Sequence, residues 1–148
     1  MPDVTLGLQP VYGLPGAPRA FVDRARDVLP TSNVGYNGIS YITDGSDAIG
    51  DGATQITKPQ YVQVDLGRAI FVRSTRMLFT DTAHCCKTGS LQSSSDGTNF
   101  TTEIPFAGDV SLDRTLPVNV RARYWRINTT DSGSAGTGVN IYTWSLFG

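Results

Sequence analysis

The sequence predicts an all-β protein, because its clearest apolar segments follow the two-residue period of a strand. Every second residue from Val62 to Leu66 is apolar, and mixed residues lie between them. A second extended run, residues 70–79, is rich in β-branched and aromatic side chains, which favour strands. Residues 118–128 alternate again. Three such runs indicate a fold built from β-strands.

The first 35 residues are expected to form an amino-terminal arm and the first strand. The apolar residues between Arg19 and Leu29 have a spacing that fits one short helix about as well as an irregular strand. Pro18 and Pro30 bracket this stretch, which favours a strand or a loop. A Tyr-Asn-Gly turn signal then lies within residues 34–43.

Two hairpins are expected in the middle of the chain. Gly67 ends the first strand, and we expect the chain to reverse there so that residues 60–66 pair with residues 70–79. The Asp-Gly turn within residues 95–99 accepts the positive φ that hairpin turns require. A polar loop, residues 80–90, separates the two hairpins.

The remaining segments are expected to be two connections and a closing strand. Residues 103–117 are expected to form a long connection between strands, because Pro105 and Pro117 oppose regular strand pairing. Residues 129–138 have almost no apolar content and are typical of a flexible surface loop. Residues 139–147 would then close the sheet near the beginning of the domain.

Four stretches of the chain match, in order, the motifs of one known family. Residues 61–67 read Tyr-Val-Gln-Val-Asp-Leu-Gly, residues 91–100 hold a Ser-x-Asp-Gly turn, and residues 121–127 read Arg-Ala-Arg-Tyr-Trp-Arg-Ile before a closing strand at residues 141–148. They resemble the strands and hairpin of discoidin, or coagulation-factor type C, domains and of related galactose-binding-like carbohydrate-binding modules. The resemblance implies an antiparallel jelly-roll β-sandwich and one discoidin-like domain over residues 1–148.

The charge balance argues against a nucleic-acid partner. The formal net charge is -1, and the arginines are spread over several segments, which is typical of strand surfaces rather than of a phosphate-binding track.

No apolar run is long enough to span a membrane, and the amino terminus lacks the regions of a signal peptide. Lectin-like modules act outside cells. We therefore expect an extracellular-facing module that is either an excised domain or leaves the cell another way, for example within a virus particle.

The adjacent cysteines, Cys85 and Cys86, do not form the framework of a secreted miniprotein, since neighbouring residues bridge only through a strained ring. Two free thiols in a loop and an interchain contact are the two interpretations. A zinc site is not expected, because His84 is the only histidine and no second cysteine pair completes four ligands.

A structural calcium site is one hypothesis for the glycine-rich segment 44–52. Its aspartates, Asp44, Asp47 and Asp51, offer the oxygen ligands that calcium prefers. In the resembling carbohydrate modules, an Asp-Gly turn at this place and a Thr-x-Trp shortly after help to hold a structural calcium. Here the Thr-x-Trp is absent, and Thr143 stands where the closing strand of the family supplies a carboxylate. The alternative is a solvated turn whose aspartates accept local backbone amides.

A ligand site is expected in the loop of residues 80–90, since loops at the end of a sandwich display recognition groups. Related sugar-binding modules carry an arginine and an Asn-Gly-Arg-like stretch here, and this chain has neither. Asp81, His84 and Lys87 are our candidates for binding sugar hydroxyls, with Tyr36 and Asn37 from the earlier turn. The alternative is a solvated loop whose histidine bonds its own backbone.

Aromatic side chains at loop tips would favour sugar stacking, and Tyr12, Tyr36 and Tyr41 are the candidates.

Catalysis finds little support, because the chain has one histidine, one glutamate and no nucleophile or phosphate-loop motif. We therefore expect a non-catalytic module that binds a glycan or another cell-surface group. The alternative is a structural or decorating component of a larger assembly such as a phage capsid or tail, which would contact its own copies or other virion proteins.

Overall fold

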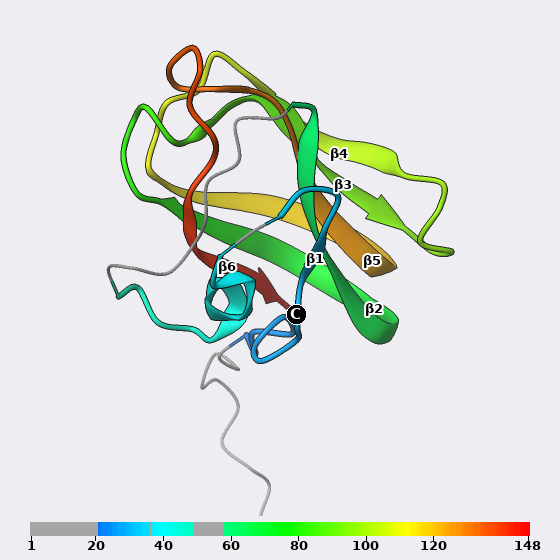
Figure 1. The fold of residues 1–148 in the computed structure, drawn as a ribbon. Coiled ribbons are helices and arrows are strands. Elements are labelled where there is room, and N and C mark those ends of the chain that lie inside the picture. Colours follow the sequence, from blue (N-terminus) through cyan, green and yellow to red (C-terminus); the bar gives the residue numbers. More distant parts are fainter. Residues whose placement is uncertain (1–20, 36, 49–57) are drawn as a thin grey trace, which may run out of the picture.

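The computed structural model describes residues 21–35, 37–48 and 58–148, and within them it is almost entirely antiparallel β-sheet (Figure 1). This confirms the predicted all-β sandwich. One short 3-10 helix, η1, interrupts the strands. The elements are β1 (Thr31–Ser32), η1 (Ile39–Thr43), β2 (Gln60–Phe79), β3 (Cys86–Ser94), β4 (Thr101–Ala107), β5 (Asp113–Ser132) and β6 (Ile141–Phe147).

The two longest strands, β2 and β5, pair with each other from Gln60 opposite Thr129 to Leu78 opposite Asp113. Their register shifts between Asp65 and Ile70, where Gly67 has a φ of 74°. Figure 1 shows that the paired strands bend there, so that each strand runs through both layers of the sandwich.

The layers follow from this bend. One layer pairs β1, the first part of β2, the last part of β5, β3 and β4. The other layer pairs β6 with the last part of β2, which continues to pair with the first part of β5. The loops that join β2 to β3 and β5 to β6 lie at one end, and the bend lies at the other (Figure 1).

The hairpin predicted around Gly67 is wrong, because the chain does not reverse there. Residues 60–66 and 70–79 belong to one strand, and both parts face β5. A positive φ at a glycine suits a bulge as well as a hairpin turn. The Asp65 carboxylate stabilises the bulge, since its Oδ1 accepts the N–H of Gly67 at 2.8 Å.

The long connection predicted over residues 103–117 is also wrong. Pro105 lies in β4 opposite Ser90, and Pro117 lies in β5 opposite Ser74. A proline is tolerated on an edge strand, because its missing N–H then faces no partner. The predicted Asp-Gly turn of residues 95–99, in contrast, is confirmed between β3 and β4.

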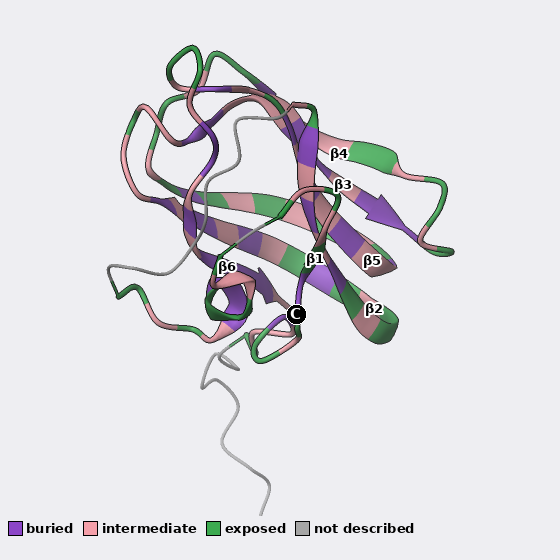
Figure 2. Ribbon diagram, viewed as in Figure 1, coloured by how far each residue is buried: buried purple, intermediate pink, exposed green. Residues whose placement is uncertain are grey.

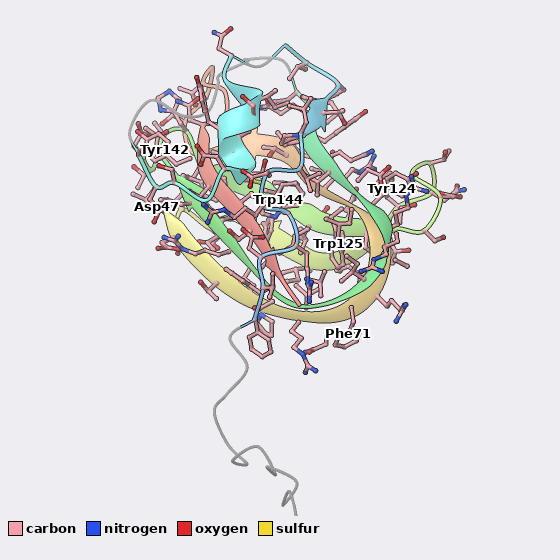
Figure 3. All side chains as sticks on the ribbon, turned by 90° about the horizontal axis from the view of Figure 1, so that it is seen from below. Asp47, Phe71, Tyr124, Trp125, Tyr142 and Trp144 are labelled. Atoms are coloured by element: carbon pink, nitrogen blue, oxygen red, sulfur yellow. The ribbon has the colours of Figure 1, made fainter. Side chains whose placement is uncertain are left out.

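The core lies between the two layers, and Figure 2 shows buried residues alternating with more exposed ones along the strands. Trp125 and Trp144 are fully buried, and Figure 3 shows both in the interior. The indole Nε1 of Trp144 donates to Thr75 Oγ1 at 3.1 Å. Truncating one such buried tryptophan to alanine typically costs about 3–5 kcal/mol, so these side chains contribute strongly to the sandwich.

The described start of the chain packs against its closing strand. Asp23 forms an isolated bridge with Phe147, and the N–H of Arg24 donates to Leu146 O at 2.7 Å. The predicted strand or loop at residues 19–29 is therefore an irregular segment where it is described, and the first strand is β1. Residues 1–20, which hold most of the predicted arm, lie outside the described residues. No helix in the described part of the chain is long and apolar enough to cross a membrane.

Candidate functional site

Two loops meet at the end of the sandwich away from the bend. Residues 80–85 join β2 to β3, residues 133–140 join β5 to β6, and together we call them the loop pair. Four backbone hydrogen bonds join them: Gly133 N to Cys85 O at 3.2 Å, Ser134 N to Ala83 O at 3.0 Å, Asn140 N to His84 O at 2.9 Å, and Thr80 N to Asn140 O at 3.3 Å. The loop pair is thus one hydrogen-bonded unit, and Figure 1 shows it beside the paired strands.

The structure brings Asp81 and His84 of the loop pair together. The ring Nδ1 of His84 lies 2.8 Å from Oδ1 and 2.9 Å from Oδ2 of Asp81. Oδ1 also accepts the backbone N–H groups of Ala83 and His84, each at 2.9 Å. The histidine ring therefore bonds a carboxylate rather than its own backbone.

This arrangement defines what each group offers a ligand. The hydrogen bond from His84 is the largest cause that lowers the pKa of Asp81, so the carboxylate stays ionised at neutral pH. In a neutral ring Nδ1 donates to Asp81, which leaves Nε2 as an acceptor. The side chains of His84 and Asp81 are 30% and 48% exposed. Both can accept hydrogen bonds from hydroxyl groups at the surface.

The other predicted ligand-binding residues do not join this pair. Lys87 lies in β3, and its side chain makes no hydrogen bond or ion pair with Asp81 or His84. Asn37 precedes η1, which Figure 1 shows apart from the loop between β2 and β3. Tyr36 and Tyr12 lie outside the described residues, whereas Tyr41 of η1 is 49% exposed.

Sequence reasoning missed the residues that the second loop contributes. Asn140 bonds the backbone of His84, and the N–H of Thr80 donates to Asn140 O at 3.3 Å. Asn140 Oδ1 and Thr80 Oγ1 are buried without a hydrogen-bond partner among the described residues. Tyr142 follows in β6 and is half-buried at the surface (Figure 3). No local pattern signals this proximity, because the two loops are far apart in the sequence.

The cysteines do not agree with the interchain contact that the sequence suggested. Cys85 and Cys86 are free thiols with no exposed surface. Burial raises the pKa of Cys86 to about 11 and also raises the pKa of Cys85. A buried, protonated thiol neither reaches a neighbouring molecule nor attacks a disulfide readily, so both side chains act as core residues.

The predicted calcium-binding aspartates are only partly within the described structure, since Asp51 lies outside it. The Asp47 carboxylate already has a cationic partner: Arg76 Nη1 and Nη2 each donate to it at 3.0 Å. The Thr143 hydroxyl lies 2.7 Å from Asp47 Oδ1, and Asp44 Oδ1 accepts the N–H of Ser46. No group of three or more His, Cys, Asp or Glu that could hold a metal ion occurs among the residues described.

These contacts do not fit a calcium site built on Asp47. Arg76 also bonds Asp113 at 2.8 and 2.9 Å, so its guanidinium joins two carboxylates from different segments. The hydrogen bond to Arg76 is the largest cause that lowers the pKa of Asp47. The guanidinium therefore supplies the positive charge that would otherwise come from a metal ion, and it holds the Asp44–Asp47 turn against β2 and β6.

We expect Gly133→Ala to separate the loop pair. A Cβ at this position would lie 1.5 Å from Thr82 O, which is a backbone atom, so one loop must move. The expected cost is about 2 kcal/mol of unfolding free energy, with faster hydrogen exchange at the Ser134 and Asn140 amides. Ala135→Ser is the control in the same loop, because the Ala135 side chain is exposed and its backbone makes none of the hydrogen bonds that join the two loops. Unchanged exchange in the Gly133 variant would contradict the hydrogen-bonded loop pair.

We expect Asp47→Asn to show the pH dependence of the contact with Arg76. A carboxyl whose pKa is lower in the folded state adds stability above its unfolded pKa of about 4 and loses it as the pH falls through the folded pKa. The variant should be less stable by about 0.5 kcal/mol at pH 7, a small value because the Asp47 side chain is 48% exposed. The difference should shrink below about pH 4.

Urea unfolding from pH 3 to pH 8, with calcium or a chelator, measures this dependence. Asp27→Asn is the control, because the pair of Asp27 with Arg26 spans 4.0 Å and is largely exposed. Calcium that stabilises the wild-type chain but not the Asp47 variant would contradict the role given to Arg76.

The fold has known relatives. Residues 30–143 match the family model of the F5/8 type C domain. A comparison with curated protein sequences gave no significant match. Among solved structures, the chain is similar to chitosan-binding module 1 from a chitosanase/glucanase of Paenibacillus sp. IK-5, with 21% identity and a TM-score of 0.75 over 86% of this chain and 99% of that chain.

Two further structures were solved with bound sugars. Chitosan-binding module 2 of the same Paenibacillus enzyme, in complex with chitotriose, is 18% identical with a TM-score of 0.74, over 85% of this chain and 100% of that chain. The Clostridium perfringens module CpGH89CBM32-4, in complex with GlcNAc-α-1,4-galactose, is 16% identical with a TM-score of 0.67, over 89% and 97% of the two chains. These likenesses establish the sandwich, and the match over residues 30–143 shows that the chain belongs to the F5/8 type C domain family.

Proposed function

We propose that the chain is a non-catalytic module that binds a neutral glycan at the loop pair. The observation that carries this proposal is the Asp81–His84 pair, whose hydrogen bonds fix two acceptors at the surface of a rigid end of the sandwich. Sugar hydroxyls donate hydrogen bonds, and acceptors held in place bind them without a large loss of side-chain entropy. A module of the same fold binds GlcNAc-α-1,4-galactose, which is uncharged, and another binds chitotriose, which carries amino groups; both support a glycan ligand.

The loop pair is suited to binding rather than to hydrolysis. Glycoside hydrolysis uses two carboxyl groups that flank the scissile bond. The sequence of the loop pair contains one carboxylate, Asp81, and its lowered pKa opposes a role as general acid at neutral pH. None of the comparisons points to the virion component that the sequence left as an alternative.

A glycan array followed by titration calorimetry tests the proposal. On the array we expect selective binding to one class of oligosaccharide. The first soluble probes are GlcNAc-α-1,4-galactose, which is uncharged, and chitotriose, which carries amino groups. His84→Ala should weaken binding about tenfold, because it removes one hydrogen bond and releases Asp81. Asp81→Asn should weaken it by a smaller factor, because the amide keeps the shape and loses the charge.

Lys87→Ala is the matched control, since Lys87 belongs to the same predicted set but its side chain makes no hydrogen bond or ion pair with Asp81 or His84. It should leave the affinity unchanged. An array without selective binding would overturn the proposed function. Selective binding that survives both His84→Ala and Asp81→Asn would place the glycan elsewhere on the molecule.

A further inference from the structure

A second feature lies at the bend of β2 and β5, at the end of the sandwich away from the loop pair. It is an open cavity of about 280 Å³ lined by Arg24, Arg68, Ala69, Ile70, Phe71 and Arg121. Figure 3 shows Phe71 at a different edge of the molecule from Tyr142, and Figure 1 shows the bend far from the loops. The cavity is thus separate from the candidate glycan site.

Three arginines from distant parts of the sequence meet at this cavity. Arg24 comes from the segment before β1, Arg68 lies at the bend, and Arg121 lies in β5 opposite Phe71. The Nε–H of Arg24 donates to Gly148 O at 3.1 Å, which fixes its guanidinium at the closing strand. The bend therefore gathers positive charge that the sequence presents as scattered.

No aspartate or glutamate of the described residues pairs with these three arginines, although most other arginines in the described structure have such partners. Arg123 bonds Asp65 at 2.7 and 2.8 Å, and Arg76 bonds two aspartates. Within the described residues, the side chains of Arg68 and Arg121 make no hydrogen bond or ion pair, and no Asp or Glu lines the cavity. Their N–H donors remain available to a ligand.

The rim of the cavity adds an aromatic surface and a fourth charge. The guanidinium carbon of Arg73 lies 5.5 Å from the ring centroids of both Phe21 and Phe71. These rings are 56% and 39% exposed. Exposed aromatic rings beside cationic donors provide an apolar face next to an anion-binding group, which suits a ligand with both an oxyanion and a ring.

We propose that this cavity binds the carboxylate or sulfate group of an acidic saccharide. Arginine donates to oxyanions through paired N–H groups, and three guanidinium groups around one cavity favour an anion there by charge as well as by geometry. A volume of about 280 Å³ lies just below the usual range for ligand pockets, which begins at about 300 Å³, so the cavity receives one charged sugar unit. The site is additional to the neutral-glycan site and does not depend on it.

Titration calorimetry with matched oligosaccharides tests this proposal. The probes are a tetrasaccharide of alternating glucuronic acid and N-acetylglucosamine, a sulfated disaccharide, an uncharged N-acetylglucosamine tetrasaccharide and inorganic sulfate. Arg68→Ala/Arg121→Ala should weaken binding of an acidic saccharide at least tenfold. The lysine pair Arg68→Lys/Arg121→Lys should be intermediate, because it keeps the charge but loses the paired donors. Higher salt should weaken the wild-type affinity.

Two controls make the result specific. Arg26→Ala removes the same charge from an arginine that does not line the cavity, and it should leave binding unchanged. His84→Ala should also leave acidic binding unchanged, which separates the two proposals. The proposal is overturned if the uncharged tetrasaccharide competes for the same site, or if Arg26→Ala weakens binding as much as the double variant. It is also overturned if inorganic sulfate is the only one of the four probes that binds. Whichever acidic probe binds more tightly identifies the oxyanion as carboxylate or sulfate.

Discussion

The bend in the paired strands β2 and β5 is the constraint on which the rest of the structure depends. Because both strands change layer together, one end of the sandwich carries the connecting loops and the other carries the bend. The Asp65–Arg123 ion pair lies at the bend, with side chains about 40% exposed. An ion pair this exposed is screened by solvent and contributes little to stability, so backbone pairing and core burial, rather than this pair, determine the bent geometry.

The two ends then differ in chemistry. At the loop end, an ionised aspartate is paired with a histidine ring, and the result is a set of hydrogen-bond acceptors. At the bend, arginines from three segments meet around one cavity that no aspartate or glutamate of the described residues lines. The first arrangement suits hydroxyl groups, and the second suits an oxyanion. A chain with a net charge of only -1 thus presents a strongly positive surface locally.

Local patterns predict the strands well but not their partners. The alternation in residues 60–66 and the Asp-Gly turn at residues 95–99 depend on neighbouring residues, and both predictions agree with the structure. The chain reversal at Gly67 was predicted wrongly, because pairing with β5 more than forty residues later decides between a turn and a bulge. Similarly, the sequence places Asp81 and His84 in one polar loop, whereas the proximity of Asn140 and the partner of Asp47, Arg76, are visible only in the folded chain.

The central claim is that the loop pair binds a glycan, and amide chemical-shift mapping tests it most directly. The ¹⁵N-labelled chain would be titrated with chitotriose and with GlcNAc-α-1,4-galactose. We expect a binding sugar to shift the amides of residues 80–85 and 133–142 and to leave those of residues 66–71 unchanged. Shifts confined to other parts of the sandwich, or no shift with either sugar, would contradict it.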